Sequence, residues 1–161
     1  MFSHSFILGP GLWVGEGKIL LNMVEEHLLY FTHWNILNRD FSGKVPCTQE
    51  IQIQGISENM RNEFYFFDFG SKSFSVEMEN QNVGKIRGIG IFDEKLIAWE
   101  FRDNEVKFEG FESYLLQPDG SYLMKGEYVS SDQFRTQIEG RIWLNPSPPP
   151  SEESSEEGGV P

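Results

Sequence analysis

The chain has only one cysteine, Cys47, among its 161 residues. One thiol excludes an internal disulfide, and such sparing use of cysteine is typical of a reducing compartment. The apolar segment 1–8 is too short for a membrane-spanning helix and has neither the positive region nor the small-residue cleavage site of a signal peptide. We therefore expect a cytoplasmic protein without membrane insertion.

Basic residues are also scarce. Thirteen lysines and arginines face twenty-five aspartates and glutamates, which gives a net charge of −12 at pH 7. Binding of nucleic acid or an anionic membrane by electrostatics requires a basic patch, so we expect neither partner. The acidic surface either keeps the protein soluble or forms a patch for a basic partner, and the composition leaves both alternatives open.

Motifs of common catalytic and metal sites are missing. The chain has no nucleophile elbow, and no helix follows the glycines of 84–90 to bind phosphate. His27 and His33 lie six residues apart on one expected strand, roughly 20 Å from each other, so they cannot share a metal ion. Cys47 has no second thiol nearby and no evident base, which favours a structural role. We expect no metal and no catalytic residue of these types.

Short segments rich in aromatic and β-branched residues, each followed by a turn sequence, fill the chain after residue 10. This pattern predicts an all-β fold. The short links favour a single antiparallel up-and-down β-barrel of about ten strands. The expected strands are 11–23, 26–37, 46–56, 60–69, 72–80, 83–92, 94–102, 105–117, 121–131 and 133–145.

The sequence divides into three parts around this barrel. Residues 1–10 form a lid or arm with at most one short helical turn, which ends at Gly9-Pro10. Residues 11–145 form the barrel domain. Residues 146–161 consist of proline, serine, glutamate and glycine almost throughout, so we expect a disordered acidic tail.

The first expected strand contains Gly11, Trp13, Gly15 and Gly17 on one face, because residues two apart point the same way. A glycine-rich face lets another backbone approach closely or lets the strand bend sharply. This pattern predicts a bent strand that closes the barrel, with Trp13 as the plug of its interior.

The pattern Gly11-x-Trp13, together with Arg141 on the last strand, resembles the calycin superfamily of lipocalins and fatty-acid-binding proteins. That resemblance implies that Trp13 plugs one end of the barrel and that Arg141 packs across it. The longer pattern Gly11-x-Trp13-x-Gly15-x-Gly17 is similar to the nitrobindin branch, ten-stranded barrels that hold haem through a histidine of the C-terminal part. Here the last histidine is His33, so the resemblance does not bring haem to this chain, and we expect no cofactor.

A cavity inside the barrel is indicated by Gly84, Ile86, Gly88 and Gly90, which share one face of a strand and leave room beside it, although glycines needed only for curvature would look the same. One carboxylate, Glu112, lies on an otherwise largely apolar row. Buried charges must be paired or hydrogen-bonded, so inward-facing polar groups would mark a ligand site. The candidate ligand-binding residues are Arg87, Glu100, Arg102, Glu112, Tyr114 and Tyr128. The alternative is that these side chains face outward, since a slip of one residue exchanges the two faces.

Three functions remain open from the sequence. The first is binding of a small hydrophobic molecule, of the lipid or fatty-acid class, inside the barrel. The second is an enzyme that uses Glu100 or Glu112 beside Tyr114 or Tyr128 for acid–base chemistry. The third is a structural barrel that pairs with a second copy through strand 60–69, whose aromatic residues lie on both faces. The chain would then be a monomer or a homodimer.

Overall fold

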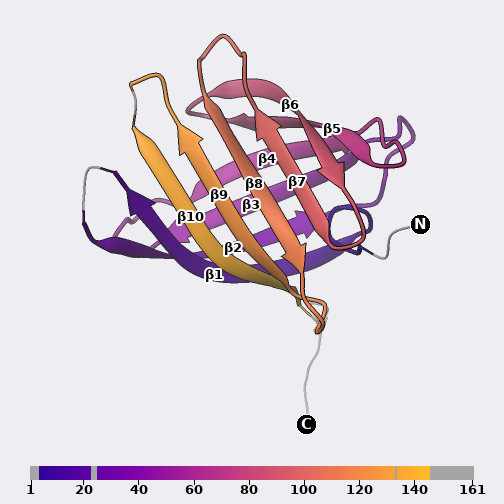
Figure 1. The fold of residues 1–161 in the computed structure, drawn as a ribbon, viewed down its shortest axis with the longest axis horizontal. Coiled ribbons are helices and arrows are strands. Elements are labelled where there is room, and N and C mark those ends of the chain that lie inside the picture. The colour runs from indigo at the N-terminus through magenta and orange to yellow at the C-terminus, as the bar shows by residue number, and fades with distance from the viewer. Residues whose placement is uncertain (1–3, 23–24, 133, 146–161) are drawn as a thin grey trace.

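The computed structural model describes residues 4–22, 25–132 and 134–145. The described residues form ten antiparallel strands that close into one barrel (Figure 1). The strands are β1 (Gly11–Leu21), β2 (His27–Ile36), β3 (Val45–Ile53), β4 (Met60–Phe67), β5 (Ser73–Asn80), β6 (Gly84–Phe92), β7 (Leu96–Phe101), β8 (Glu109–Leu116), β9 (Tyr122–Val129) and β10 (Arg135–Leu144). The predicted tail, 146–161, lies outside the described residues.

Each strand pairs with its neighbour in sequence, and β1 pairs with β10 to close the sheet. In that closing pair Gly15 lies opposite Ile142, and Gly17 lies opposite Gly140. The all-β class and the up-and-down topology predicted from the sequence are confirmed. No helix in the described part of the chain has the length and apolar character needed to cross a membrane.

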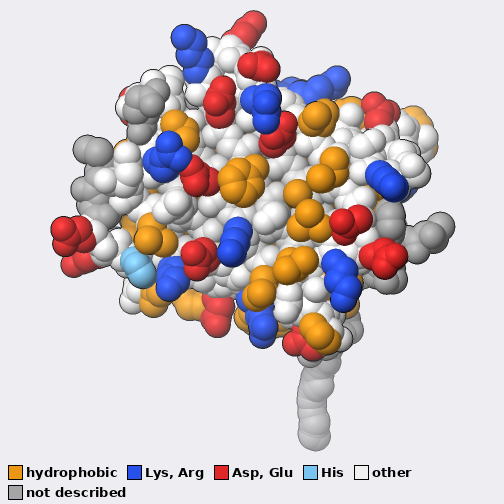
Figure 2. Space-filling model, in the orientation of Figure 1, with side chains coloured by type: hydrophobic (Ala, Val, Ile, Leu, Met, Phe, Trp, Pro, Cys, Tyr) orange, Lys and Arg blue, Asp and Glu red, His pale blue; other side chains and the backbone are white. Residues whose placement is uncertain are grey.

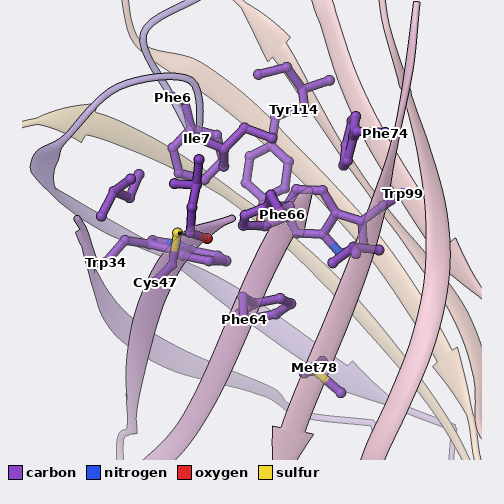
Figure 3. Close-up of a cluster of buried hydrophobic side chains, with 14 of the residues drawn as sticks. Phe6, Ile7, Trp34, Cys47, Phe64, Phe66, Phe74, Met78, Trp99 and Tyr114 are labelled. Atoms are coloured by element: carbon purple, nitrogen blue, oxygen red, sulfur yellow. Dashed lines mark hydrogen bonds between the residues drawn. The ribbon is translucent and has the colours of Figure 1, made fainter. Parts of the chain in front are cut away.

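One end of the barrel is filled by aromatic side chains. Trp13 is only 1% exposed, and its ring centroid lies 5.3 Å from that of Phe6 and 5.6 Å from that of Tyr122. Trp34 and Trp99, both labelled in Figure 3, pack edge to face with ring centroids 6.2 Å apart. Aromatic pairs in such geometries stabilise a core beyond the area they bury. We call this half of the interior the aromatic end.

The N-terminal segment contributes to the aromatic end. Residues 6–8 form a turn, and the side chains of Phe6 and Ile7 are completely buried. The His4 ring lies 2.7 Å from the Tyr122 hydroxyl through Nδ1 and 2.6 Å from the Asp93 carbonyl oxygen through Nε2. The segment therefore plugs this end of the barrel with its side chains.

Arg141 pairs with Glu16 where β1 and β10 close the barrel, but its side chain does not pack across Trp13, so the role that the resemblance implied for it is wrong. Its side chain is exposed on the outer wall, because Gly140 and Ile142 occupy the inward positions of β10. Phe6 and Tyr122 occupy the space against Trp13 instead. An apolar plug from the N-terminus thus contacts the indole where the resemblance implied a guanidinium.

Part of the cavity indicated by the glycines of β6 is filled. A Cβ placed on Gly90 would overlap the ring of Phe74, and one placed on Gly88 would overlap the Glu100 carbonyl oxygen and approach the ring of Phe101. These glycines face inward as predicted, but neighbouring rings and backbone occupy the room they leave. Glycine here permits close packing and leaves no space for a ligand.

The outer aromatic side chains of β4 are covered by the chain itself. The ammonium of Lys44 lies 5.0 Å from the ring centroid of Phe67, and the guanidinium of Arg87 lies 5.2 Å from it. Cations over ring faces are attracted by the ring quadrupole. The two-sided apolarity of this strand is therefore accounted for within one chain. Elsewhere on the wall, Figure 2 shows hydrophobic side chains interspersed with charged ones.

Candidate functional site

The opposite half of the barrel contains a cavity of about 310 Å³. This volume is near the lower limit of the roughly 300–1,000 Å³ typical of small-molecule sites. Its lining is mainly apolar, with a small set of amide, hydroxyl and carboxyl groups. The lining residues are Ile19, Leu21, Leu28, Tyr30, Gln49, Ile51, Ile53, Ile56, Met60, Asn62, Met78, Asn80, Asn82, Val83, Phe108, Glu112, Met124, Tyr128, Thr136 and Ile138. We call this space the interior cavity.

Glu112 is the carboxyl group of this cavity. It lies on the inward row of β8 and is 6% exposed. Tyr114, two residues along the same row, donates its hydroxyl to Oε1, and Tyr128 of β9 donates to Oε2. Gly126 stands opposite Glu112 in β9, where a Cβ would lie 3.1 Å from the Met124 methyl group and 3.1 Å from the Phe111 carbonyl oxygen. One acid and two phenols thus form a connected polar cluster, which we call the Glu112 cluster.

The tyrosine rings of the cavity lie against glycines. A Cβ on Gly110 would overlap the Tyr128 ring, and a Cβ on Gly140 would lie too close to the Tyr30 hydroxyl oxygen. The Tyr30 hydroxyl is also 4.0 Å from the sulfur of Met124. Bare glycine positions therefore give these large side chains room to lie along the wall rather than across the cavity.

Burial dominates the electrostatics of the Glu112 cluster. Loss of solvation raises the pKa of Glu112, while the hydrogen bonds from Tyr114 and Tyr128 act in the opposite direction with smaller effect. Burial and the nearby carboxyl group raise the pKa of Tyr114 and Tyr128 well above the usual phenol value. The two hydroxyls therefore stay protonated, and Glu112 is the group of this cluster that changes charge most easily.

A row of polar side chains lies on the other wall of the cavity, on β2 to β5. Asn80 donates to Asn62 at 2.9 Å, Asn62 donates to Gln49 at 3.0 Å, and Gln49 donates to Thr32 at 3.2 Å. Thr32 in turn donates to the Glu50 carbonyl oxygen at 2.9 Å. Each group has a partner, as buried polar groups require. We call these residues the amide row.

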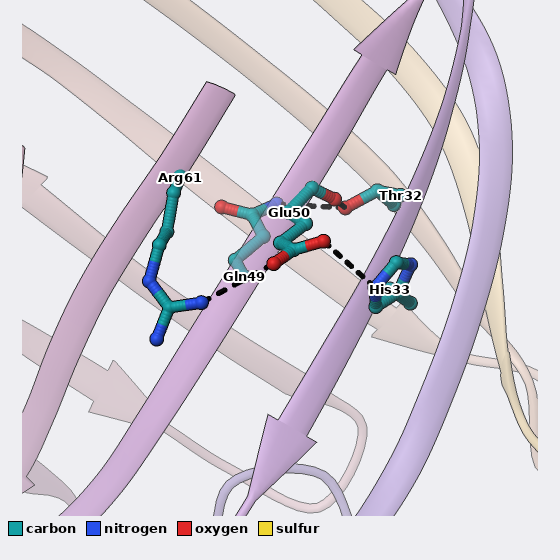
Figure 4. A network of polar contacts seen from close by, with 5 residues as sticks. All are labelled: Thr32, His33, Gln49, Glu50 and Arg61. Carbon is teal, nitrogen blue, oxygen red and sulfur yellow. Dashed lines mark hydrogen bonds and ion pairs between the residues drawn. The ribbon is translucent and has the colours of Figure 1, made fainter. Parts of the chain in front are cut away.

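The outer side of the same strands carries a different network, drawn in Figure 4. The Glu50 carboxylate lies 3.2 Å from Arg61 and 3.2 Å from the His33 ring. Gln49 and Glu50 are adjacent, so one faces the interior and the other the wall. His33 is thereby explained as an exposed partner of a carboxylate.

The structure brings together three of the predicted site residues, Glu112, Tyr114 and Tyr128, and separates the other three. The side chains of Arg87 and Arg102 are 67% and 63% exposed. Arg102 donates to Glu100 at 2.7 Å on the outer wall. The expectation that Arg87, Glu100 and Arg102 face the interior is wrong, because Ile86, Trp99 and Phe101 occupy the inward positions beside them.

The sequence analysis missed Tyr30 and the amide row. Each of these residues stands on an inward-facing row that is otherwise apolar, with Tyr30 and Thr32 preceding Trp34 and Ile36, and Gln49 following Cys47. A polar residue at the alternating position of a buried row is the same feature that identified Glu112. Applied to every strand, this criterion would have identified Tyr30 and the amide row.

The remaining chemistry-bearing groups offer no second site. Cys47 is buried, its sulfur lies 3.9 Å from the Val45 carbonyl oxygen, and burial raises the pKa of the thiol. A thiol in such surroundings is unreactive. The described residues contain no group of three or more histidine, cysteine, aspartate or glutamate side chains suited to a metal ion.

Haem does not fit the interior cavity in the manner that the nitrobindin resemblance implies. No histidine is among the described residues that line it. His4 lies at the aromatic end, while His27 and His33 are exposed on β2. The residues present therefore provide no imidazole ligand for haem iron.

We expect Glu112→Gln to change the pH dependence of stability. Because folding raises the pKa of this carboxyl group above its ordinary value of 4.5, its contribution is fully present below that value and is lost as pH rises through the folded-state pKa. The amide that replaces the carboxyl group cannot ionise. The stability of the variant relative to the wild type should therefore increase with pH over this window, by at most about 1.4 kcal/mol per pH unit.

Urea denaturation of both proteins between about pH 4 and about pH 8 measures this difference. Asp40, Asp119 and Asp132, whose pKa is lowered by hydrogen bonds from neighbouring serines, act in the opposite direction but equally in both proteins. If the difference in unfolding free energy between the two proteins does not change over this pH range, folding does not raise the pKa of Glu112.

The chain was compared with known proteins. No model of a protein family matches it, and no curated protein matches it significantly in sequence.

Proposed function

We propose that this protein binds a small, largely apolar molecule in the interior cavity. The observation that carries the proposal is the uneven filling of the barrel: aromatic rings occupy one half, and a cavity with few polar groups occupies the other. Side chains of a protein core normally pack with few voids larger than a water molecule. A space of about 310 Å³ lined by isoleucine, leucine and methionine suits an apolar occupant.

The resemblance to calycins, proteins that hold apolar ligands inside a barrel, supports this proposal from the sequence side. Membership of that superfamily is part of the proposal. The ligand class that this membership implies is lipid-like molecules of the cavity's size.

Ile138→Trp tests the proposal by filling the cavity. Ile138 packs between the aromatic end and the cluster of Ile19, Tyr30 and Ile53, so a larger ring there occupies the ligand space. Titration with the neutral solvatochromic dye prodan should give a blue-shifted, saturable emission with the wild type. The affinity of the variant should be at least about tenfold weaker.

Ile89→Trp is the matched control, because Ile89 is 64% exposed on the outer wall of β6. It adds the same side chain without touching the cavity and should bind prodan like the wild type. Equal binding by all three proteins would place the dye outside the barrel and would reject the proposal. Circular dichroism verifies that both variants remain folded.

A second function, acid–base catalysis, is favoured by one observation. Glu112 is a buried carboxyl group of raised pKa beside a cavity of substrate size, which is the setting of many general acids and bases. Exchange of the α-protons of 2-octanone for deuterium, followed by NMR, tests it. Exchange no faster with the wild type than with Glu112→Gln would reject this function and leave ligand binding untouched.

A further inference from the structure

The Glu112 cluster has no cation. None of the thirteen lysines and arginines is buried, and none lines the interior cavity. The two that are only partly exposed, Lys18 and Lys44, lie on the outer wall, where Lys44 covers Tyr65 and Phe67. The groups that face the carboxyl group are the phenols Tyr30, Tyr114 and Tyr128, which are neutral. Its negative charge is therefore uncompensated within the described chain.

Aromatic rings line the cavity near the same position. Phe108 stacks on Tyr128 with ring centroids 5.0 Å apart, and both side chains line the cavity. Tyr30 lines it from β2, close enough to Glu112 for the two to interact electrostatically. A carboxylate in a cavity lined by aromatic rings suits an organic cation, because the charge attracts the cation and the rings tolerate its contact better than aliphatic carbon does.

The other walls do not compete for that cation. The amide row is neutral. The side-chain carbonyl oxygens of Gln49 and Asn62 accept hydrogen bonds from within the row, and that of Asn80 accepts from two backbone N–H groups of the following turn. The remaining lining is mostly aliphatic, aromatic and thioether carbon, and its other polar side chains, Asn82 and Thr136, are neutral. A ligand complementary to both the carboxyl group and the apolar lining thus has one positively charged end and an apolar body.

We propose, resting on the proposed function, that the ligand is a small amphiphilic amine whose ammonium group binds Glu112 beside the tyrosines of the cavity, with its apolar body among the isoleucines. The ammonium supplies the charge that the carboxylate lacks and donates hydrogen bonds to it. A fatty acid would bring a second negative charge to Glu112 and is disfavoured by the same geometry.

Proton release follows from this arrangement. Burial raises the pKa of Glu112, so the free protein holds a proton on this acid up to a higher pH than a solvated carboxyl group would. Binding of an ammonium ion favours the carboxylate and releases that proton to solvent. The affinity for an amine should therefore increase as pH rises through the pKa of Glu112, whereas the affinity for an uncharged ligand should not.

Isothermal titration calorimetry with three probes of equal chain length tests the proposal: n-octylamine, n-octanol and octanoate, at neutral pH. We expect n-octylamine to bind at least about tenfold more tightly than n-octanol, and octanoate to bind most weakly. Glu112→Gln should weaken the affinity for n-octylamine at least about tenfold and leave the affinity for n-octanol unchanged. Glu139→Gln, which removes the same charge from the exposed face of β10, should change neither.

Two results would overturn the inference. One is n-octanol or octanoate binding as tightly as n-octylamine, and the other is an amine affinity that Glu112→Gln does not alter. If the Glu112→Gln variant fails to fold, the affinity of the wild type for n-octylamine is measured as a function of pH instead. An affinity that does not change with pH also overturns the inference. Prodan separates the two proposals. If prodan binds but n-octylamine is not preferred, only the inference of an amine ligand is rejected. If neither prodan nor any other probe binds, the proposed function is rejected.

Discussion

Replacing Trp13 by alanine should lower the free energy of unfolding by about 3–5 kcal/mol, the usual cost of truncating a buried aromatic side chain. Trp13 is almost completely buried and contacts Phe6 and Tyr122 at the aromatic end. Its indole N–H has no hydrogen-bond partner among the described residues, so the substitution breaks no described hydrogen bond. The loss measures packing against the N-terminal plug. Urea denaturation, analysed by linear extrapolation, provides the value.

Trp143→Ala is the control for this prediction. Trp143 lies on β10 opposite Val14, on the outer wall, and is 36% exposed. Its truncation should cost less than about 1 kcal/mol, because a surface side chain leaves no cavity. Similar losses in the two variants would mean that Trp13 does not fill the interior, and the account of the aromatic end would be wrong.

The Gly17→Ala variant should lose about 3 kcal/mol of stability, near the upper end of the usual cost of overpacking. Gly17 and Gly140 lie directly opposite each other where β1 and β10 close the barrel. A Cβ on residue 17 would lie 2.6 Å from the Cα of Gly140 and closer still to the carbonyl oxygen of Glu139. Both atoms belong to the backbone, so no change of rotamer relieves the overlap and the strands must separate.

Gly9→Ala provides the comparison for that variant. A Cβ on Gly9 would meet no atom within 4 Å. We expect its free energy of unfolding to stay within about 0.5 kcal/mol of the wild type. Should Gly17→Ala prove as stable as Gly9→Ala, the two strands would not approach each other as closely as described.

The strands could be predicted from the sequence because their causes are local. Alternating inward residues and turn sequences such as 117–121 place each boundary without knowledge of the rest of the fold. The largest difference is the start of β8, expected at residue 105 and found at Glu109. There the Asn104 side chain bonds the backbone of Phe108 at both the amide and the carbonyl group, which holds 104–108 as a loop.

The candidate site could be predicted only in part. The alternation along β8 placed Glu112 and Tyr114 on the inward row correctly. The same alternation applied to β6 would have placed Arg87 outside, since Ile86 and Gly88 face inward. Arg102 lies beyond the end of β7 at Phe101, where alternation no longer specifies a face.

Which part of the barrel is filled could not be predicted, because it depends on contacts between strands distant in sequence. The Phe74 ring lies over Gly90 in the packed part of the core, whereas the Tyr128 ring lies over Gly110 and lines the cavity. Both are an aromatic ring against an inward glycine. The sequence pattern is therefore the same at a packed position and at a cavity wall.

We expect the methyl resonances of methionine to report directly on a small molecule bound in the interior cavity. Met78 and Met124 are buried and line the cavity from opposite walls, on β5 and β9. NMR of the methionine-methyl-labelled protein during titration with prodan should shift both resonances saturably, at one dye per chain, and Ile138→Trp should abolish the shifts. Both resonances staying in place while the dye saturates would contradict the account.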